Sequence, residues 1–460
     1  MNNFHAGAAQ IDITPPLGTL INGDFVSHYA HLIHDPLYAK AIVLRNDQVS
    51  IAFVVVDICL MQKDFIEEVK NQINKQTNIN PGQILISATH THGGGSVEGL
   101  LLAAADLPYR QKLKQRIVSV VMQAKERLRP AKIAFGSVEV PEHVVCRRYF
   151  MQEGYEAYNP VTGKLDKIKT NPFGGEDRIV KRENVTDPEV SYLALQGQDN
   201  QWIGLLANYS MHYVGDWENG TITSDYFGVF AKQLKSLLRV SDNFVAIMSN
   251  GTSGDANIVD LLQPDRYPKG YFTKSAFIGK DIAERTFNSL RGLTWDDNPT
   301  LSSLYEEIPV KVRKPSSIEL KAAERVVMET RYDHLSMKEV SHTGNDDNLK
   351  RIYAREQVLL SEYPDAVLFP LQVIKVGIGM IGGLGGEFFA KTGLWLKENG
   401  KTKNYFTVCL ANGYTGYVPP AHEFDLGGYE TWRCRSSFLE INAEKIIRDK
   451  LHQLINLVKK

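Results

Sequence analysis

The chain has 460 residues, of which 43% are hydrophobic, 23% charged and 10% aromatic. This composition is ordinary for a folded globular protein and excludes long disordered stretches. Lys and Arg number 52 against 53 Asp and Glu, so the formal net charge is -1. Because nucleic-acid-binding surfaces are strongly basic, this balance and the absence of a Lys/Arg-rich stripe exclude a nucleic-acid partner.

The four cysteines are too few for a disulfide framework and contain no CxxC pair. No window reaches the roughly 18 apolar, uncharged residues of a membrane span, so we expect no transmembrane segment. The N-terminal residues lack a basic stretch followed by an apolar one. The sequence therefore shows no signal peptide, and the default expectation is a cytoplasmic protein, although a removed leader would leave the same sequence.

Short β-rich runs alternate with helical patterns at the start of the chain. Strands are predicted at residues 39–45, 51–57, 84–89 and 132–140, with helices at 62–76 and 109–128. This β-α-β-α-β order predicts an α/β fold, with helices flanking a mixed, partly parallel sheet.

The stretch at residues 147–188 has little periodicity and much Gly, Pro, Asn and charge, which is typical of a functional loop. Further strands are predicted at 190–195, 202–209, 244–248, 371–378 and 406–411, and helices at 225–238, 318–330, 349–362, 388–399 and 439–458. The charged helices at 318–330 and 349–362 are expected to face solvent. Because no internal repeat is found, we expect one large domain covering residues 1–460.

The most informative motif is Thr-His-Thr-His-Gly-Gly-Gly, which contains His90 and His92 at the end of an apolar run. Side chains two residues apart on a strand share a face, so both imidazoles can point into one pocket. Neutral imidazole is a good zinc ligand; a hydrogen-bonded pair near a turn is the alternative. His212 ends the 202–209 strand in similar surroundings, where a purely structural role is also open.

Polar residues also follow three later strands. Ser253, Asp255 and Asn257 lie in a small polar loop after the 244–248 strand, which is typical of a substrate-facing loop or of a plain turn. Glu387 follows a glycine-rich run and is predicted to begin the 388–399 helix, where an anion can bind or a carboxylate can complete a metal site. Tyr417 follows the 406–411 strand. Strand ends of this kind can converge at one rim of a sheet and predict a site at the C-terminal ends of the strands.

These segments resemble the catalytic domain of the neutral/alkaline non-lysosomal ceramidase family, from Ala6 to the final helix. The resemblance implies one zinc ion per chain, held by the two histidines, the glutamate and the tyrosine that match the family's motifs: His90, His212, Glu387 and Tyr417. It further implies that His92 and Tyr429 contact the scissile group and that Arg147 reaches the substrate.

The sequence departs from the family at two points. The family has a catalytic serine in a Gly-Asp-x-Ser-Pro-Asn segment, whereas Asn257 occupies that place here and Ser253 is not an obvious replacement. We also expect no immunoglobulin-like C-terminal domain. The chain thus looks like a shorter, bacterial-type branch that shares the fold and the metal site, and ceramide as substrate does not follow.

The leading hypothesis is a zinc-dependent hydrolase that cleaves an amide or ester bond by metal-activated water. His92 would act as acid/base or as donor to the oxyanion, with help from Tyr429 and Arg147. Asp255 and Asp57 would orient the ligand histidines. The charged 147–188 segment suggests a small polar or anionic substrate, with sugar-derived compounds as one class.

Three further residues are predicted to contact the substrate: Asn257, Ser253 and Arg148. Two alternatives remain open for the function. One is a neutral ceramidase with a different nucleophile, and the other is a ligand-binding protein that lost catalysis together with the serine. Iron or manganese would suit two His, one Glu and one Tyr nearly as well as zinc.

Overall fold

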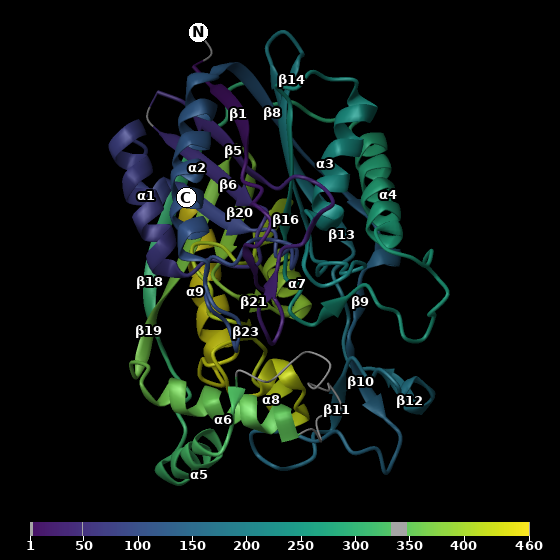
Figure 1. Cartoon of the computed structure of the whole chain (residues 1–460). Helices are drawn as coiled ribbons and strands as arrows, with labels where there is room; N and C mark the ends of the chain where they lie inside the picture. The colour runs from purple at the N-terminus through teal and green to yellow at the C-terminus, as the bar shows by residue number, and fades with distance from the viewer. Residues whose placement is uncertain (1–2, 48, 333–346, 460) are drawn as a thin grey trace.

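The computed structural model describes residues 3–47, 49–332 and 347–459 (Figure 1). Within these ranges, an eight-stranded sheet has the order β16-β14-β13-β8-β1-β5-β6-β7. Its strands are β1 His5–Asp12, β5 Tyr38–Arg45, β6 Ser50–Val56, β7 Ile84–Ala88, β8 Arg129–Glu139, β13 Glu189–Gly197, β14 Trp202–Tyr209 and β16 Val245–Asn250. The edge pairs β6–β7 and β14–β16 are parallel, and the other neighbours are antiparallel.

A four-stranded sheet with the order β18-β19-β20-β22 packs against the first one. Its strands are β18 Leu301–Lys311, β19 Ala366–Val376, β20 Gly379–Leu384 and β22 Asn404–Val408. The interface between the sheets is a continuous apolar core, in which Phe53 and Leu206 of the large sheet meet Ile374, Ile381 and Phe406 of the small one. Burial of these side chains holds the two sheets together.

Helices cover the outer faces of both sheets (Figure 1). The large sheet is covered by α1 Lys63–Thr77, α2 Leu107–Glu126, α3 Asp225–Leu238 and α4 Thr273–Ser289, and the small sheet by α7 Ala390–Asn399 and α9 Ala443–Lys459. The fold is therefore a layered α/β domain with a large mixed sheet, as predicted. None of the helices in the described ranges is long and apolar enough to cross a membrane.

Shorter elements complete the described chain. They are β2 Leu20–Ile21, β3 His28–Tyr29, β4 Leu32–Ile33, β9 Val145–Cys146, β10 Arg148–Met151, β11 Ile168–Thr170, β12 Ile179–Arg182, β15 Thr221–Ile222, β17 Ala256–Asn257, β21 Glu387–Phe388, β23 Tyr417–Val418, α5 Ser317–Met328, α6 Asp347–Ser361 and α8 Glu423–Leu426. The predicted loop at 147–188 thus contains a small three-stranded sheet, β11-β10-β12.

Two local predictions are wrong. Glu387 does not begin a helix, because its backbone N–H donates to the carbonyl of Gly416 and β21 pairs in parallel with β23; α7 begins at Ala390. The helix predicted at 349–362 is not a solvent-facing one. In α6, Leu349, Ile352 and Tyr353 form the buried side of an amphipathic helix, and Glu356 on the same side is buried in an ion pair with Arg435.

Candidate metal centre and active site

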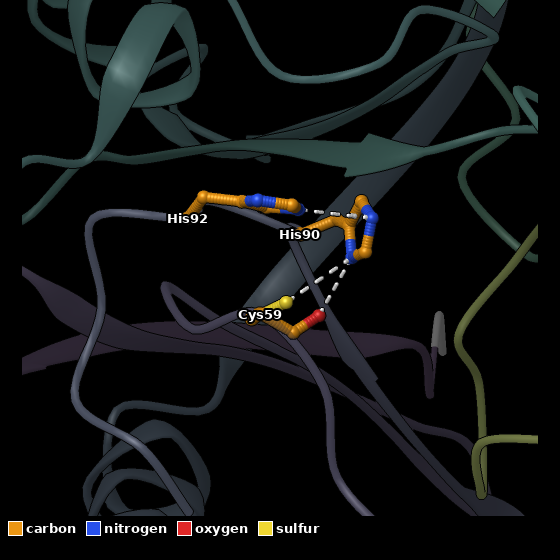
Figure 2. A group of neighbouring side chains, drawn as sticks. All are labelled: Cys59, His90 and His92. Carbon is orange, nitrogen blue, oxygen red and sulfur yellow. Dashed lines mark hydrogen bonds between the residues drawn. The ribbon is translucent and has the colours of Figure 1, made fainter. Parts of the chain in front are cut away.

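His90 lies two residues beyond β7, where its backbone and its ring are both fixed. Its φ of 74° is in the left-handed region, which residues other than glycine rarely adopt. Its Nδ1 atom lies 2.9 Å from the carbonyl oxygen of Cys59, and Figure 2 shows this contact beside the Cys59 thiol. An N–H at Nδ1 donates to that carbonyl, so Nε2 carries the lone pair. This is the arrangement that orients a histidine as a metal ligand.

The Nε2 atoms of His90 and His212 converge on one carboxylate oxygen. Glu387 Oε2 lies 3.4 Å from Nε2 of His90 and 3.9 Å from Nε2 of His212. The potential ligand atoms of the three residues all lie within 4.8 Å of one another. Their side chains are buried, yet Oε2 makes no hydrogen bond to any residue in the described ranges. A buried carboxylate oxygen without a partner is costly, so this donor set fits a divalent cation.

Two tyrosines lie beside the Glu387 carboxylate. The Tyr414 hydroxyl donates to Oε1 over 2.9 Å, which leaves Oε2 free to face the histidines. Tyr417 stands opposite Glu387 in the parallel β21–β23 pair, so both side chains leave the same face of the ladder, and both line the cavity described below. Sequence reasoning selected Tyr417 and missed Tyr414, because only the fold shows which hydroxyl reaches Oε1.

The histidines differ in their affinity for protons. Burial, and then the positive charges nearby, lower the pKa of His92 and His212 well below the usual range. Burial also opposes protonation of His90, but the Glu387 carboxylate outweighs it and raises the pKa of that imidazole. Burial opposes ionisation of Glu387 as well, and the adjacent His90 lowers its pKa nevertheless. The carboxylate is therefore held in its charged form.

His92 lies on the cavity side of His90. The two Nε2 atoms are 3.4 Å apart, and the rings are nearly perpendicular, at 88°, as Figure 2 shows. The His92 ring stacks on Tyr213, with 3.6 Å between the ring centroids. A Cβ at Gly23 would come within 2.5 Å of the His92 ring, so only glycine fits behind it. The imidazole is thus fixed from two sides, and Tyr213 was not predicted.

Arg147 is held in one orientation by four neighbours. Its Nε donates to Glu430 Oε1 over 3.0 Å, and its Nη2 donates to the carbonyl of Gly254 over 2.7 Å. The guanidinium lies over the rings of Tyr417 and Tyr429, 5.4 Å and 5.1 Å from their centroids. This arrangement provides a fixed positive charge at the cavity wall. Glu430, which orients it, was not predicted.

The other predicted residues lie further from the metal ligands. Asp255 accepts hydrogen bonds from the backbone N–H of Ala390 and from Asn184, each over 2.8 Å. Asp57 accepts from the N–H of Tyr38 over 2.9 Å and lies 3.9 Å from Lys40 Nζ. The contacts of both carboxylates are thus with groups other than the histidines, and the Cys59 carbonyl orients His90.

Of the three residues predicted to contact substrate, Asn257 lines the cavity, and Ser253 and Arg148 are not among its lining residues. The Asn257 amide is engaged: Nδ2 donates to Asn171, and Oδ1 accepts from the next two backbone N–H groups. Ser253 donates to Asn250 Oδ1 over 2.7 Å. Arg148 is fully buried and donates to Glu430 and Glu423, each over 2.9 Å.

A cavity of about 510 Å³ opens above these groups. Its inner end holds the histidines, Glu387, Arg147 and the tyrosines. The rest of its wall comes from separate segments of the chain and is mixed. Its apolar and aromatic side chains include Phe25, Leu101, Ile168, Phe173, Trp217, Leu349, Tyr353 and Trp432, and its polar ones include Asn22, Asp24, His28, Asp166, Lys169, Asn171 and Asn219. Apolar surface combined with convergent polar groups is typical of a small-molecule site.

Comparison with known proteins identifies a matching family profile and two solved structures with a similar fold. Residues 4–259 match the family profile described as neutral/alkaline non-lysosomal ceramidase, N-terminal. The fold is similar to that of neutral ceramidase from Pseudomonas aeruginosa, with a TM-score of 0.70 and 15% identity over 99% of this chain and 74% of that one. A ceramidase complexed with C2 gives a TM-score of 0.69 and 15% identity over 100% of this chain and 76% of that one. A search of the curated protein sequences found no match to this chain.

Proposed function

The chain belongs to the neutral/alkaline non-lysosomal ceramidase family, a family of hydrolases, and we propose that it is a metal-dependent hydrolase of amide or ester bonds. The ion would be zinc, held by His90, His212, Glu387 and Tyr417. The observation that carries the proposal is the convergence of two imidazole Nε2 atoms on a buried carboxylate oxygen without a hydrogen bond.

The protein contributes the orientation of these ligands. Donation to the Cys59 carbonyl selects the tautomer of His90, and Tyr414 directs Glu387 Oε2 toward the histidines. When bound, zinc supplies a Lewis acid for the scissile carbonyl and lowers the pKa of a water molecule. Iron or manganese would suit the same donor atoms.

His92, Arg147 and Tyr429 are proposed to act on the substrate. His92 accepts a proton during attack on the carbonyl and returns it to the leaving amine or alcohol, a role suited to an imidazole fixed by stacking. Arg147 and the Tyr429 hydroxyl stabilise the negative charge that develops on the carbonyl oxygen. Because Glu430 and Gly254 already hold Arg147, little reorganisation is needed when that charge appears.

The cavity walls favour an amphiphilic, ceramide-like N-acyl amide over a small polar substrate. The charged 147–188 segment suggested a polar substrate; it contributes Ile168 and Phe173 to the wall, together with the polar side chains of Asp166, Lys169 and Asn171. Ile168 and Phe173, together with Leu101, Trp217 and Trp432, offer apolar surface to a hydrocarbon chain. The proposed substrate therefore places its amide beside His92 and its chain along this wall.

The test of the proposal is the metal content of the purified protein. We expect about one zinc per chain, and we expect the double variant His90→Ala/His212→Ala to lose zinc and turnover of a fluorogenic N-acyl amide while its circular dichroism is unchanged. The matched control is His452→Ala, a histidine on α9 that bonds the Asn399 carbonyl and should retain zinc. Wild-type protein without metal, even after zinc is supplied, would favour the ligand-binding alternative.

Replacing Asn257 tests whether the position of the family's serine still matters. We propose that catalysis here does not pass through residue 257, so Asn257→Ser and Asn257→Ala should have kcat/KM values within about tenfold of each other. Both variants lose the hydrogen bonds of the amide and share that structural cost. A burst of product with Asn257→Ser but not with Asn257→Ala would show that a serine at this position becomes the nucleophile.

A further inference from the structure

A second group of potential metal ligands lies beside α7 and α8, on the far side of Arg148 from Arg147. Within the described part of the chain, the ligand atoms of Glu183, His422 and Glu423 lie within 4.8 Å of one another. His422 lines an open groove of about 500 Å³ together with Lys391 and Trp395, among others, whereas the side chains of Glu183 and Glu423 are buried and do not line it. Ions in solution therefore have a route to His422.

The ammonium of Lys391 lies among these three ligands without hydrogen-bonding to the carboxylates. Its Nζ is 3.6 Å from Glu183 Oε1, 3.6 Å from Glu423 Oε1 and 3.2 Å from His422 Nε2. Glu423 Oε1 and Glu183 Oε2 are buried and make no hydrogen bond within the described ranges. Glu183 Oε2 lies 3.6 Å from Nε of the buried Arg148, and Lys391 Nζ lies 3.6 Å from Glu423 Oε1. Neither cation thus gives these oxygens the hydrogen bond that a buried carboxylate oxygen normally has.

The contacts of His422 Nε2 conflict with one another. The atom lies 3.2 Å from the Lys391 ammonium and 3.0 Å from Glu423 Oε1. An ammonium can only donate, so a hydrogen bond from Lys391 requires a lone pair at Nε2. That lone pair then faces a carboxylate oxygen at close range. A cation bound by both atoms would remove the repulsion.

Two cations, Arg148 and Lys391, face these carboxylates, and Arg148 is fully buried. Lys391 is replaceable: 38% of its side chain is exposed, so its ammonium can turn outward into water, whereas Glu423 is fully buried. The carboxylates are thus the permanent part of the group, and the lysine is the mobile part.

We propose that Glu183, His422 and Glu423 form a second divalent-cation site, distinct from the candidate active site, in which the Lys391 ammonium competes with the metal. One imidazole and two carboxylates suit zinc or manganese. Binding displaces Lys391 toward solvent and joins α8 to β12 and the segment that follows it. The proposal uses none of the residues assigned to catalysis and does not depend on the proposed reaction.

The test uses protein in which the site of His90, His212, Glu387 and Tyr417 is already loaded with zinc. Isothermal titration then measures the binding of further zinc to this protein. We expect wild-type protein to bind one further zinc ion weakly, and Lys391→Met to bind it about tenfold or more tightly, because a competing charge has been removed. Lys445→Met is the matched control, since Lys445 lines the same groove but makes its ion pair with Asp449. Its titration should match that of wild type.

Removing a ligand should have the opposite effect. In Lys391→Met/His422→Ala the extra zinc should be lost; His422 is 56% exposed, so its truncation does not threaten the fold. Equal zinc affinity of Lys391→Met and wild type, or extra binding that persists in the double variant, would overturn the proposal. The first result would make Lys391 the permanent partner of these carboxylates, and the second would show that the extra zinc binds without His422.

Discussion

Glu387→Gln is expected to lower kcat/KM for the amide substrate by about 1,000-fold or more, which corresponds to about 4 kcal/mol of lost transition-state stabilisation. The reason is local geometry. The Tyr414 hydroxyl donates to Oε1, so the amide oxygen of the glutamine takes that position. Its NH₂ group then points at Nε2 of His90 and of His212, where Oε2 lies in the native protein. Two donor hydrogens would therefore occupy the space of the cation.

The measurement is zinc per chain together with steady-state kinetics. Tyr414→Phe is the matched control, because it removes the hydroxyl that orients the carboxylate and leaves the carboxylate charge. We expect it to weaken metal affinity by about 10- to 100-fold, the usual effect of losing a partner of a metal ligand, with activity restored by excess zinc. Glu387→Gln should not be restored. Full zinc content and near-normal turnover in Glu387→Gln would contradict the assignment of Glu387 as a ligand.

The elements that were predicted from the sequence are those with a strong local pattern. The strand predicted at 202–209 and the helix predicted at 225–238 have the bounds of β14 and α3. In contrast, β1 and β18 were not predicted. The first contains mainly small residues, Ala and Gly among them, and the second carries Glu306 and Glu307 on a half-exposed surface. Both form because neighbouring strands pair with them, which propensity alone does not reveal.

The candidate site shows the same division. His90, His92, His212 and Glu387 were found because each follows an apolar strand, and their family motifs were recognisable. The groups that orient them were not found. The bond from His90 to Cys59 joins residues 31 positions apart, and that from Arg147 to Glu430 joins residues 283 positions apart. No local pattern marks such partners, and a backbone carbonyl such as that of Cys59 has no sequence signature at all.

Glu430→Gln is expected to reduce the free energy of unfolding by about 3–5 kcal/mol, the usual cost of removing one partner from a buried ion pair. Glu430 is fully buried, and its carboxylate accepts from Arg147 over 3.0 Å, from Arg148 over 2.9 Å and from Thr170 over 2.8 Å. A neutral amide leaves two buried guanidinium groups with less compensating charge. The NH₂ group of the glutamine would also face an N–H or O–H group of Arg147, Arg148 or Thr170, and two donors cannot form a hydrogen bond with each other.

Urea unfolding of the variant measures this effect, and the exposed pair of Lys114 with Glu68 supplies the control. Lys114 Nζ and Glu68 Oε2 are 2.7 Å apart, but half of the Glu68 side chain is exposed. Glu68→Gln should therefore lower the free energy of unfolding by less than about 1 kcal/mol. Since Glu430 also holds Arg147, Glu430→Gln should lower kcat more than it raises KM, whereas Glu68→Gln should change neither. A stability loss for Glu430→Gln no larger than that for Glu68→Gln would show that Arg147 and Arg148 are held in place by their other contacts.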